Sequence, residues 1–132
     1  MAVERKGEKV ARLVSKLAVV GIFTAVGWLP KLVMPVNSAA LVEKLEGFGG
    51  RAAVTGIGVV ELVTVVLLLV PRTALIGAVL ASAVMLGAIG SHLGPVGVEG
   101  DFLGVFVMAI VGLVASVVTG VLEMRRRRGA GD

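Results

Sequence analysis

The sequence predicts an all-α polytopic membrane protein: an antiparallel four-helix transmembrane bundle with a short amphipathic outer-surface helix between spans one and two. Three observations support this fold class. The chain of 132 residues is 57% hydrophobic and has a mean hydropathy of +1.01, well above that of an ordinary soluble domain. Its charged residues gather near the two ends. Four apolar segments of about twenty residues each are long enough to cross ~30 Å of hydrocarbon as helices.

The predicted spans lie at about 14–34, 52–70, 73–93 and 102–122, between a basic N-terminus at 1–13 and a basic tail at 123–132. Span one is the weakest, because Lys16 and Lys31 lie within it and must extend toward the two membrane surfaces. A cleaved signal peptide is the alternative interpretation, and it is disfavoured because no small-residue cleavage site follows. Pro30 should bend or end this helix.

The connection between spans one and two is the longest in the chain. It contains Leu41, Leu45 and Phe48 at positions i, i+4 and i+7, a spacing that favours a short amphipathic helix lying on the outer surface. The candidate caps are Asn37 or Ser38 at its start and Gly47 or Gly49 at its end. A plain loop is the alternative.

The distribution of lysine and arginine predicts the orientation. Of thirteen such residues, five lie in the first sixteen positions and four form the run 125–128. Arg72 in the short link between spans two and three falls on the same side. The positive-inside rule therefore places both termini in the cytoplasm. Because the Pro71–Arg72 link is so short, spans two and three must be antiparallel neighbours.

Small residues should hold the helices together, because lipid gives apolar helices no hydrophobic reason to associate. Small side chains recur on spans two and three and follow a four-residue spacing on span four. The predicted packing residues are Gly58, Gly77, Ala81, Gly87, Gly112, Ser116 and Gly120. They serve either packing within one bundle, which we favour, or a dimer interface.

Glu61 lies near the middle of span two, about 13 Å from its start by helix rise. A charged side chain at this depth costs at least ~2.5–3.5 kcal/mol, so Glu61 should face the bundle interior. Gly58 and Thr64 lie three residues to either side, on the same helix face. The functional interpretation is a proton-titrating or ligand-contacting group. The structural interpretation is a protonated or paired carboxyl that links helices by hydrogen bonds.

Three further residues are candidates for a site near Glu61. His92 ends span three and either points into the bundle mouth or caps the helix at the headgroups. Trp28, the sole tryptophan, is either an interfacial anchor or part of an entrance with Lys31 and His92, if Pro30 opens the outer end. The long stem of Lys31 could reach Glu61. Since Glu61 and His92 differ in depth by roughly 10 Å or more, a water or a ligand would have to bridge them.

Several classes of function lack support. With no cysteine in the chain, disulfides, cysteine metal sites and thiol redox chemistry are excluded, and a single histidine argues against a metal site. The high pI, about 10.1, indicates attraction to anionic lipid and not nucleic acid, because the basic residues flank apolar spans and aromatics make up only 4%. No phosphate loop, dinucleotide fingerprint or serine–histidine–aspartate order is present. No enzymatic reaction and no cofactor is therefore indicated, apart from a possible quinone or lipid.

Three stretches resemble the DoxX-like family of small four-span bacterial membrane proteins, over about residues 13–122. They are "GWLPKL" at 27–32, "GIGVVELVTVVLLLVPRTALIGA" at 56–78 and "MLGAIGSHL" at 85–93. The resemblance implies a protein of the bacterial inner membrane and draws attention to Lys31, Glu61 and His92, which match the family pattern. Some members are membrane partners of a thiosulfate:quinone oxidoreductase, and others assist redox defence or membrane-protein assembly. The family name does not transfer a reaction.

The expected function is that of a non-catalytic membrane subunit or accessory factor, which binds a partner protein or a second copy and has room for a lipid or quinone between its helices. One alternative is a proton-coupled small-molecule transporter that uses Glu61. Small multidrug exporters, however, place this carboxylate in the first span and are richer in aromatics. The other alternative is a membrane subunit of a quinone-linked oxidoreductase, to which this chain could not itself supply the electron-carrying centre.

Overall fold

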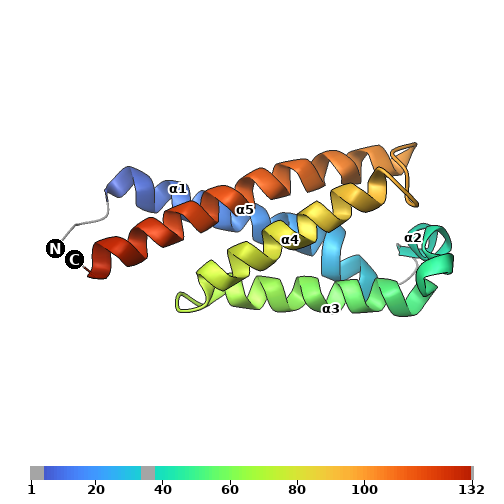
Figure 1. The fold of residues 1–132 in the computed structure, drawn as a ribbon, viewed down its shortest axis with the longest axis horizontal. Helices are drawn as coiled ribbons and strands as arrows, with labels where there is room; N and C mark the ends of the chain where they lie inside the picture. Colours follow the sequence, from blue (N-terminus) through green and yellow to red (C-terminus); the bar gives the residue numbers. More distant parts are fainter. Residues whose placement is uncertain (1–4, 34–37, 132) are drawn as a thin grey trace.

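The computed structural model describes residues 5–33 and 38–131, and these residues form helices and connections with no strand. Met34, at the predicted end of span one, and Asn37, a predicted cap, lie outside them. The elements are α1 (Lys6–Ile22), η1 (Phe23–Val33), α2 (Ala39–Lys44), η3 (Glu46–Phe48), α3 (Gly50–Leu69), α4 (Ala74–His92) and α5 (Asp101–Gly131). Figure 1 shows them as one elongated helical molecule.

Four helical stretches are long and apolar enough to cross a membrane. They are Lys6–Val33, Gly50–Leu69, Ala74–His92 and Asp101–Gly131. By length and composition the chain is therefore a multi-pass membrane protein, and the all-helical prediction with four candidate spans is confirmed at this level. The helix α5 has 31 residues and is about 46 Å long, so the predicted basic tail continues the helix as far as Gly131.

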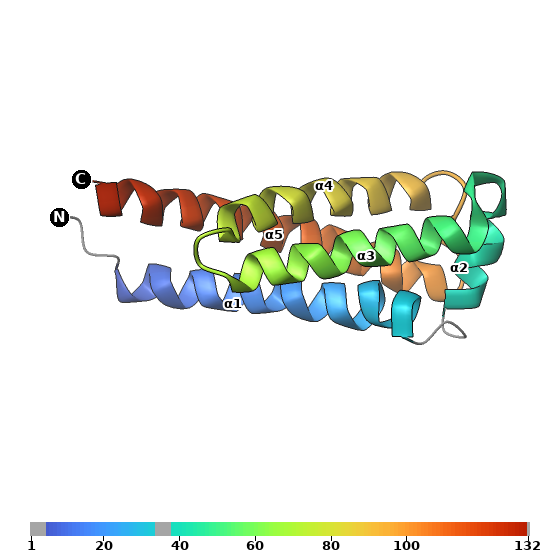
Figure 2. The same cartoon turned by 90° about the horizontal axis from the view of Figure 1, so that it is seen from below.

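The two termini lie at the same end of the molecule, together with the turn between α3 and α4 (Figures 1 and 2). We call this the terminal end. The opposite end, which we call the loop end, holds α2, η3 and the connection between α4 and α5. This arrangement gives the two ends of the bundle different polar groups, which are described below.

The main core joins all four long helical stretches. Its buried apolar residues are Val19, Ile22, Phe23, Val65, Leu68, Ala78, Ala81, Met85 and Ala109. At the loop end, a second cluster of Leu45, Val54 and Val96 connects the α2–η3 segment to α3 and to the loop before α5. Many large apolar side chains elsewhere are exposed, among them Val63, Val66, Val79 and Val114. Such an apolar exterior is what a lipid environment requires.

Close contacts between helices fall at predicted small residues. A Cβ atom added at Gly77 would lie 2.7 Å from the backbone nitrogen of Leu68, and one at Gly112 would lie 2.8 Å from Met85 Sδ. Gly58 packs against η1 in the same way, and Gly120 packs against Ala78. Ala81 and Ser116 are fully buried.

Gly87 differs from the other packing candidates. A Cβ atom added there would meet nothing within 4 Å, and the residue, which is exposed, lines an open cavity. The absence of a side chain at this position therefore leaves space open and does not bring two backbones together.

The segment after the first span contains the short helix α2 followed by η3. Leu45 is buried and Leu41 packs beside it, whereas Phe48 is 69% exposed. Ser38 occupies the N-cap position of α2, but its side chain does not cap the helix. Its hydroxyl oxygen instead accepts a hydrogen bond from Arg51 Nη1 at 2.9 Å. Gly49 ends η3 with φ 109°, a left-handed conformation that suits glycine.

Candidate functional site

A kink in the first span sets the geometry of the site. Pro30 has no N–H group, and its ring excludes the carbonyl of Val26, four residues earlier, from helical hydrogen bonding. The backbone departs from helical geometry at Gly27, with φ −103° and ψ −110°. Lys31 Nζ donates to the released Val26 carbonyl at 3.4 Å. The kink therefore directs the side chain of Lys31 into the bundle, where it is buried.

Lys31 forms a buried ion pair with Glu61. Its Nζ atom lies 2.9 Å from both carboxylate oxygens, and the two side chains are 8% and 7% exposed. The pair joins η1 to α3. Attraction between opposite charges in a low-dielectric interior, together with two hydrogen bonds, offsets the cost of removing both groups from water. Glu61 is thus a paired carboxyl, as one of the two interpretations of the sequence requires.

Two glycines make room for this ion pair. A Cβ atom at Gly27 would lie 3.1 Å from Glu61 Oε2, and one at Gly58 would lie 3.0 Å from the Cβ of Lys31. Glycine at these positions allows the backbones of η1 and α3 to approach closely enough for the lysine and the carboxylate to meet.

A cavity of about 920 Å³ opens beside the ion pair, within the loop-end half of the bundle. Its apolar walls include Ile57, Val60, Val84, Met85, Val105 and Ala109. Lys31, Glu61 and His92 contribute the buried titratable groups of its lining. From His92 to Met85 the cavity follows α4 for about two turns, or ~10 Å. Its size and largely apolar lining with few polar groups are typical of small-molecule sites.

His92 ends α4 and is only 5% exposed. Its Nδ1 atom lies 2.8 Å from the carbonyl oxygen of Gly97. The rings of Phe102 and Phe106 lie beside it, with centroids 6.0 and 5.9 Å away. His92 and Glu61 line the same cavity, although no hydrogen bond joins them among the described residues.

Trp28 and Thr64 do not line the cavity. The indole N–H of Trp28 donates to Thr24 Oγ1 at 3.1 Å, and the ring packs against the main core. Thr64 is fully buried, and its hydroxyl donates to the carbonyl of Val60 at 2.7 Å. Of the five residues that the sequence singles out, Lys31, Glu61 and His92 are brought to one cavity.

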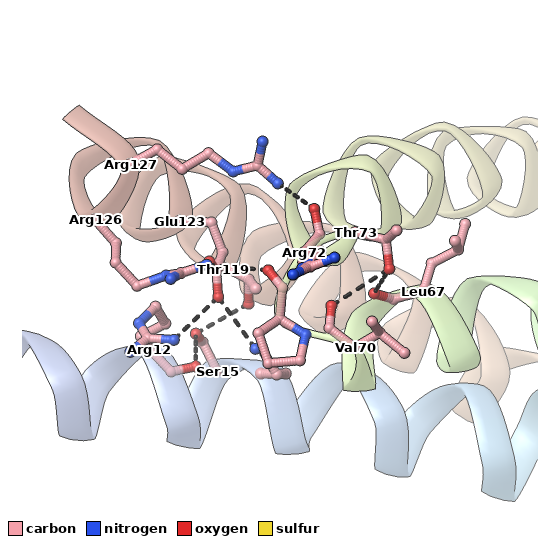
Figure 3. Close-up of polar contacts among 12 residues, drawn as sticks. Arg12, Ser15, Leu67, Val70, Arg72, Thr73, Thr119, Glu123, Arg126 and Arg127 are labelled. Atoms are coloured by element: carbon pink, nitrogen blue, oxygen red, sulfur yellow. Dashed lines mark hydrogen bonds and ion pairs between the residues drawn. The ribbon is translucent and has the colours of Figure 1, made fainter. Parts of the chain in front are cut away.

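Glu123 is a second buried carboxylate, which the sequence reasoning missed. It is fully buried at the terminal end. Its Oε1 atom lies 3.2 Å from Arg12 Nη1 and 3.1 Å from Lys16 Nζ, and its Oε2 atom lies 2.9 Å from Arg126 Nε. Figure 3 shows how Arg12 and Arg126 converge on it. The available signal was a lone acidic residue between an apolar span and four arginines.

Within 5–33 and 38–131, no group of three or more histidine, cysteine, aspartate or glutamate side chains could hold a metal ion. Comparisons with known proteins found no matching protein family, no matching curated protein and no matching solved structure.

Proposed function

We propose that this chain is a non-catalytic integral membrane subunit or accessory factor, whose cavity holds an amphipathic molecule such as a lipid or quinone. The observation that carries the proposal is the cavity of about 920 Å³ with apolar walls and the buried polar groups of Lys31, Glu61 and His92. Apolar walls suit a hydrocarbon chain, and a few fixed polar groups suit a small head group.

The proposal includes a membrane orientation. The helices form an antiparallel transmembrane bundle in the bacterial inner membrane, with both termini in the cytoplasm and α2 lying on the outer surface as an amphipathic helix. The excess of lysine and arginine at the terminal end supports this orientation. The cavity then lies in the outer half of the membrane.

A protein partner or a second copy of the chain completes the proposed role, as the resemblance to DoxX-like proteins implies. The apolar exterior is compatible with a subunit that binds and presents a molecule while another protein acts on it. Crosslinking in native membranes, followed by identification of the crosslinked chains, tests this part separately.

The cavity itself is tested by filling it. Gly87 lines the cavity with open space beside it, whereas Gly90, on the same helix, has open space beside it but does not line the cavity. The protein is purified in mild detergent, and its co-purifying lipids and quinones are measured by mass spectrometry. We expect a specific lipid or quinone to be enriched with the wild type and Gly90→Leu, and lost with Gly87→Leu. Equal recovery from both variants would refute the cavity as the binding site.

A second candidate function is proton-coupled transport, which the burial of Glu61 on a cavity wall favours. Its difficulty is that Lys31 already supplies the carboxylate with a fixed cation, so a transport cycle would have to break this ion pair. Proton-driven uptake into proteoliposomes that is abolished by Glu61→Gln would establish transport and overturn the accessory role.

A further inference from the structure

One nitrogen of the His92 ring has a fixed partner. The carbonyl of Gly97 can only accept a hydrogen bond, so Nδ1, at 2.8 Å, must donate one. In the neutral ring the proton is then on Nδ1, and Nε2 has a free lone pair. The neighbouring backbone therefore selects the tautomer in which Nε2 is an acceptor.

The second nitrogen, Nε2, is left without a partner among the described residues, where the only polar contact of the ring is the one through Nδ1. Among the described residues, every fully enclosed side-chain nitrogen or oxygen has a hydrogen-bond partner. Because Nε2 has no partner, it is not fully enclosed and must touch open space. The residue is nevertheless 95% buried, at 5% exposure, and the open space that it lines is the cavity. An acceptor therefore faces the cavity from a ring that is otherwise enclosed.

The other buried polar groups of the cavity already have partners. The ammonium group of Lys31 donates to both oxygens of Glu61 and to the Val26 carbonyl. Each carboxylate oxygen of Glu61 accepts from that ammonium. The acidic residues at the rim, Glu99 and Asp101, are exposed and thus hydrated. Each Glu61 oxygen keeps a further lone pair, but it already faces the Lys31 ammonium, whereas His92 Nε2 is a buried acceptor of the cavity lining with no partner among the described residues.

The position of the ring is constrained. Phe102 and Phe106 lie against it at 6.0 and 5.9 Å, and the Gly97 hydrogen bond holds its other edge. An acceptor that is already oriented loses little conformational freedom when it binds a ligand, so more of its hydrogen-bond energy appears as affinity.

From this geometry we propose that His92 Nε2 is the anchor for the head group of the cavity ligand, and that this ligand is a hydroxyl-bearing amphiphile. Long-chain alcohols, acylglycerols and hydroquinones carry such a donor, whereas an ether or an oxidised quinone offers only acceptors. This inference rests on the proposed function, which places a lipid-like molecule in the cavity. It adds the chemistry by which the cavity would select that molecule.

The test compares two probes of equal chain length, tritiated oleyl alcohol and oleyl methyl ether, on the full chain in phosphatidylcholine nanodiscs. The ether oxygen can accept but cannot donate. We expect wild-type protein to bind the alcohol about tenfold more tightly, the size of one hydrogen bond. His92→Asn keeps a donor for Gly97 but has no group at the Nε2 position, so the preference should disappear while ether binding persists. His92→Gln can place its amide oxygen there and should retain the preference.

A spectroscopic measurement avoids any dependence on variants. His92 is the single histidine of the chain, so its two ring nitrogens can be followed in ¹⁵N-histidine-labelled wild-type protein. Addition of the alcohol should shift the Nε2 resonance, and addition of the ether should not. Equal binding of both probes to the wild type, or an unmoved Nε2 resonance, would refute the role of His92 while the cavity proposal stands. If neither probe binds the wild type, the proposed function fails, and this inference fails with it.

Discussion

The two ends of the bundle each contain a buried carboxylate, but the surroundings of the two carboxylates differ. Glu123 at the terminal end is fully buried and touches three cations, from α1 and from its own helix. Glu61 toward the loop end pairs with one cation within 5–33 and 38–131, Lys31, and lies on a cavity wall. The comparison shows that a buried charge alone does not mark a binding site. The open space beside Glu61 is the feature that distinguishes the two.

The terminal end is closed by further polar contacts. Arg126 Nη2 donates to the carbonyl of Pro71 at 3.0 Å, and Arg127 Nη2 donates to that of Arg72 at 2.6 Å. Figure 3 shows these arginines reaching from α5 to the turn between α3 and α4. The network through Glu123 thus joins α1, α5 and that turn, which is the arrangement expected of a structural clamp.

The largest expected effect comes from Glu123→Ala. This change leaves Arg12, Lys16 and Arg126 close together without their shared anion, and removal of one partner from a buried ion pair costs about 3–5 kcal/mol. The free energy of unfolding in detergent should fall by that amount. Glu8→Ala is the control, because Glu8 is partly exposed and lies 3.7 Å from Arg125, so stability should change by less than about 0.5 kcal/mol. Equal effects of the two changes would contradict the clamp.

A smaller loss is expected from Lys31→Met, about 2–3 kcal/mol, because the cavity lets water reach the unpaired Glu61. The double variant Lys31→Met with Glu61→Leu removes both charges and should recover most of that stability. Chemical denaturation of four proteins, namely the wild type, Lys31→Met, Glu61→Leu and the double variant, forms a double-mutant cycle and measures the coupling. A double variant no more stable than Lys31→Met alone would show that the loss does not come from the unpaired charge of Glu61.

The helix α4 allows the same substitution to be made at both ends. Gly77→Ala should destabilise the protein by about 1–3 kcal/mol, because the new Cβ would lie 2.7 Å from the backbone nitrogen of Leu68. Gly87→Ala adds a methyl group to open space and should be neutral or stabilising by about 0.5 kcal/mol. Thermal unfolding of both variants tests whether α4 packs more tightly at Gly77 than at Gly87. Loss of stability from Gly87→Ala as large as that from Gly77→Ala would contradict the open space beside Gly87.

The smallest effect is expected from Arg127→Gln. Arg127 is exposed and gives one hydrogen bond to Arg72, so stability should change by less than about 0.5 kcal/mol. A loss as large as that of Glu123→Ala would extend the clamp to the whole arginine run.

The sequence by itself determined the number and position of the long helices, because length and apolarity are local properties of the chain. The helices α3 and α4 end within two residues of their predicted bounds. Pro30 likewise predicted a bend, because the loss of its backbone N–H group removes a hydrogen bond within the same helix. A contact between Lys31 and Glu61 was one of the possibilities that the sequence left open.

Only the tertiary structure decided which side chains meet. In helices that are apolar on nearly every side, the sequence does not specify how each is rotated about its axis, so it could not separate Gly77, in a close contact, from Gly87, on a cavity. For the same reason it could not show that Trp28 and Thr64, two of the candidates, do not line the cavity. Glu123 meets Arg12 across 111 positions of sequence, and His92 shares a cavity with Glu61. Both arrangements depend on the packing of whole helices, which no local pattern encodes.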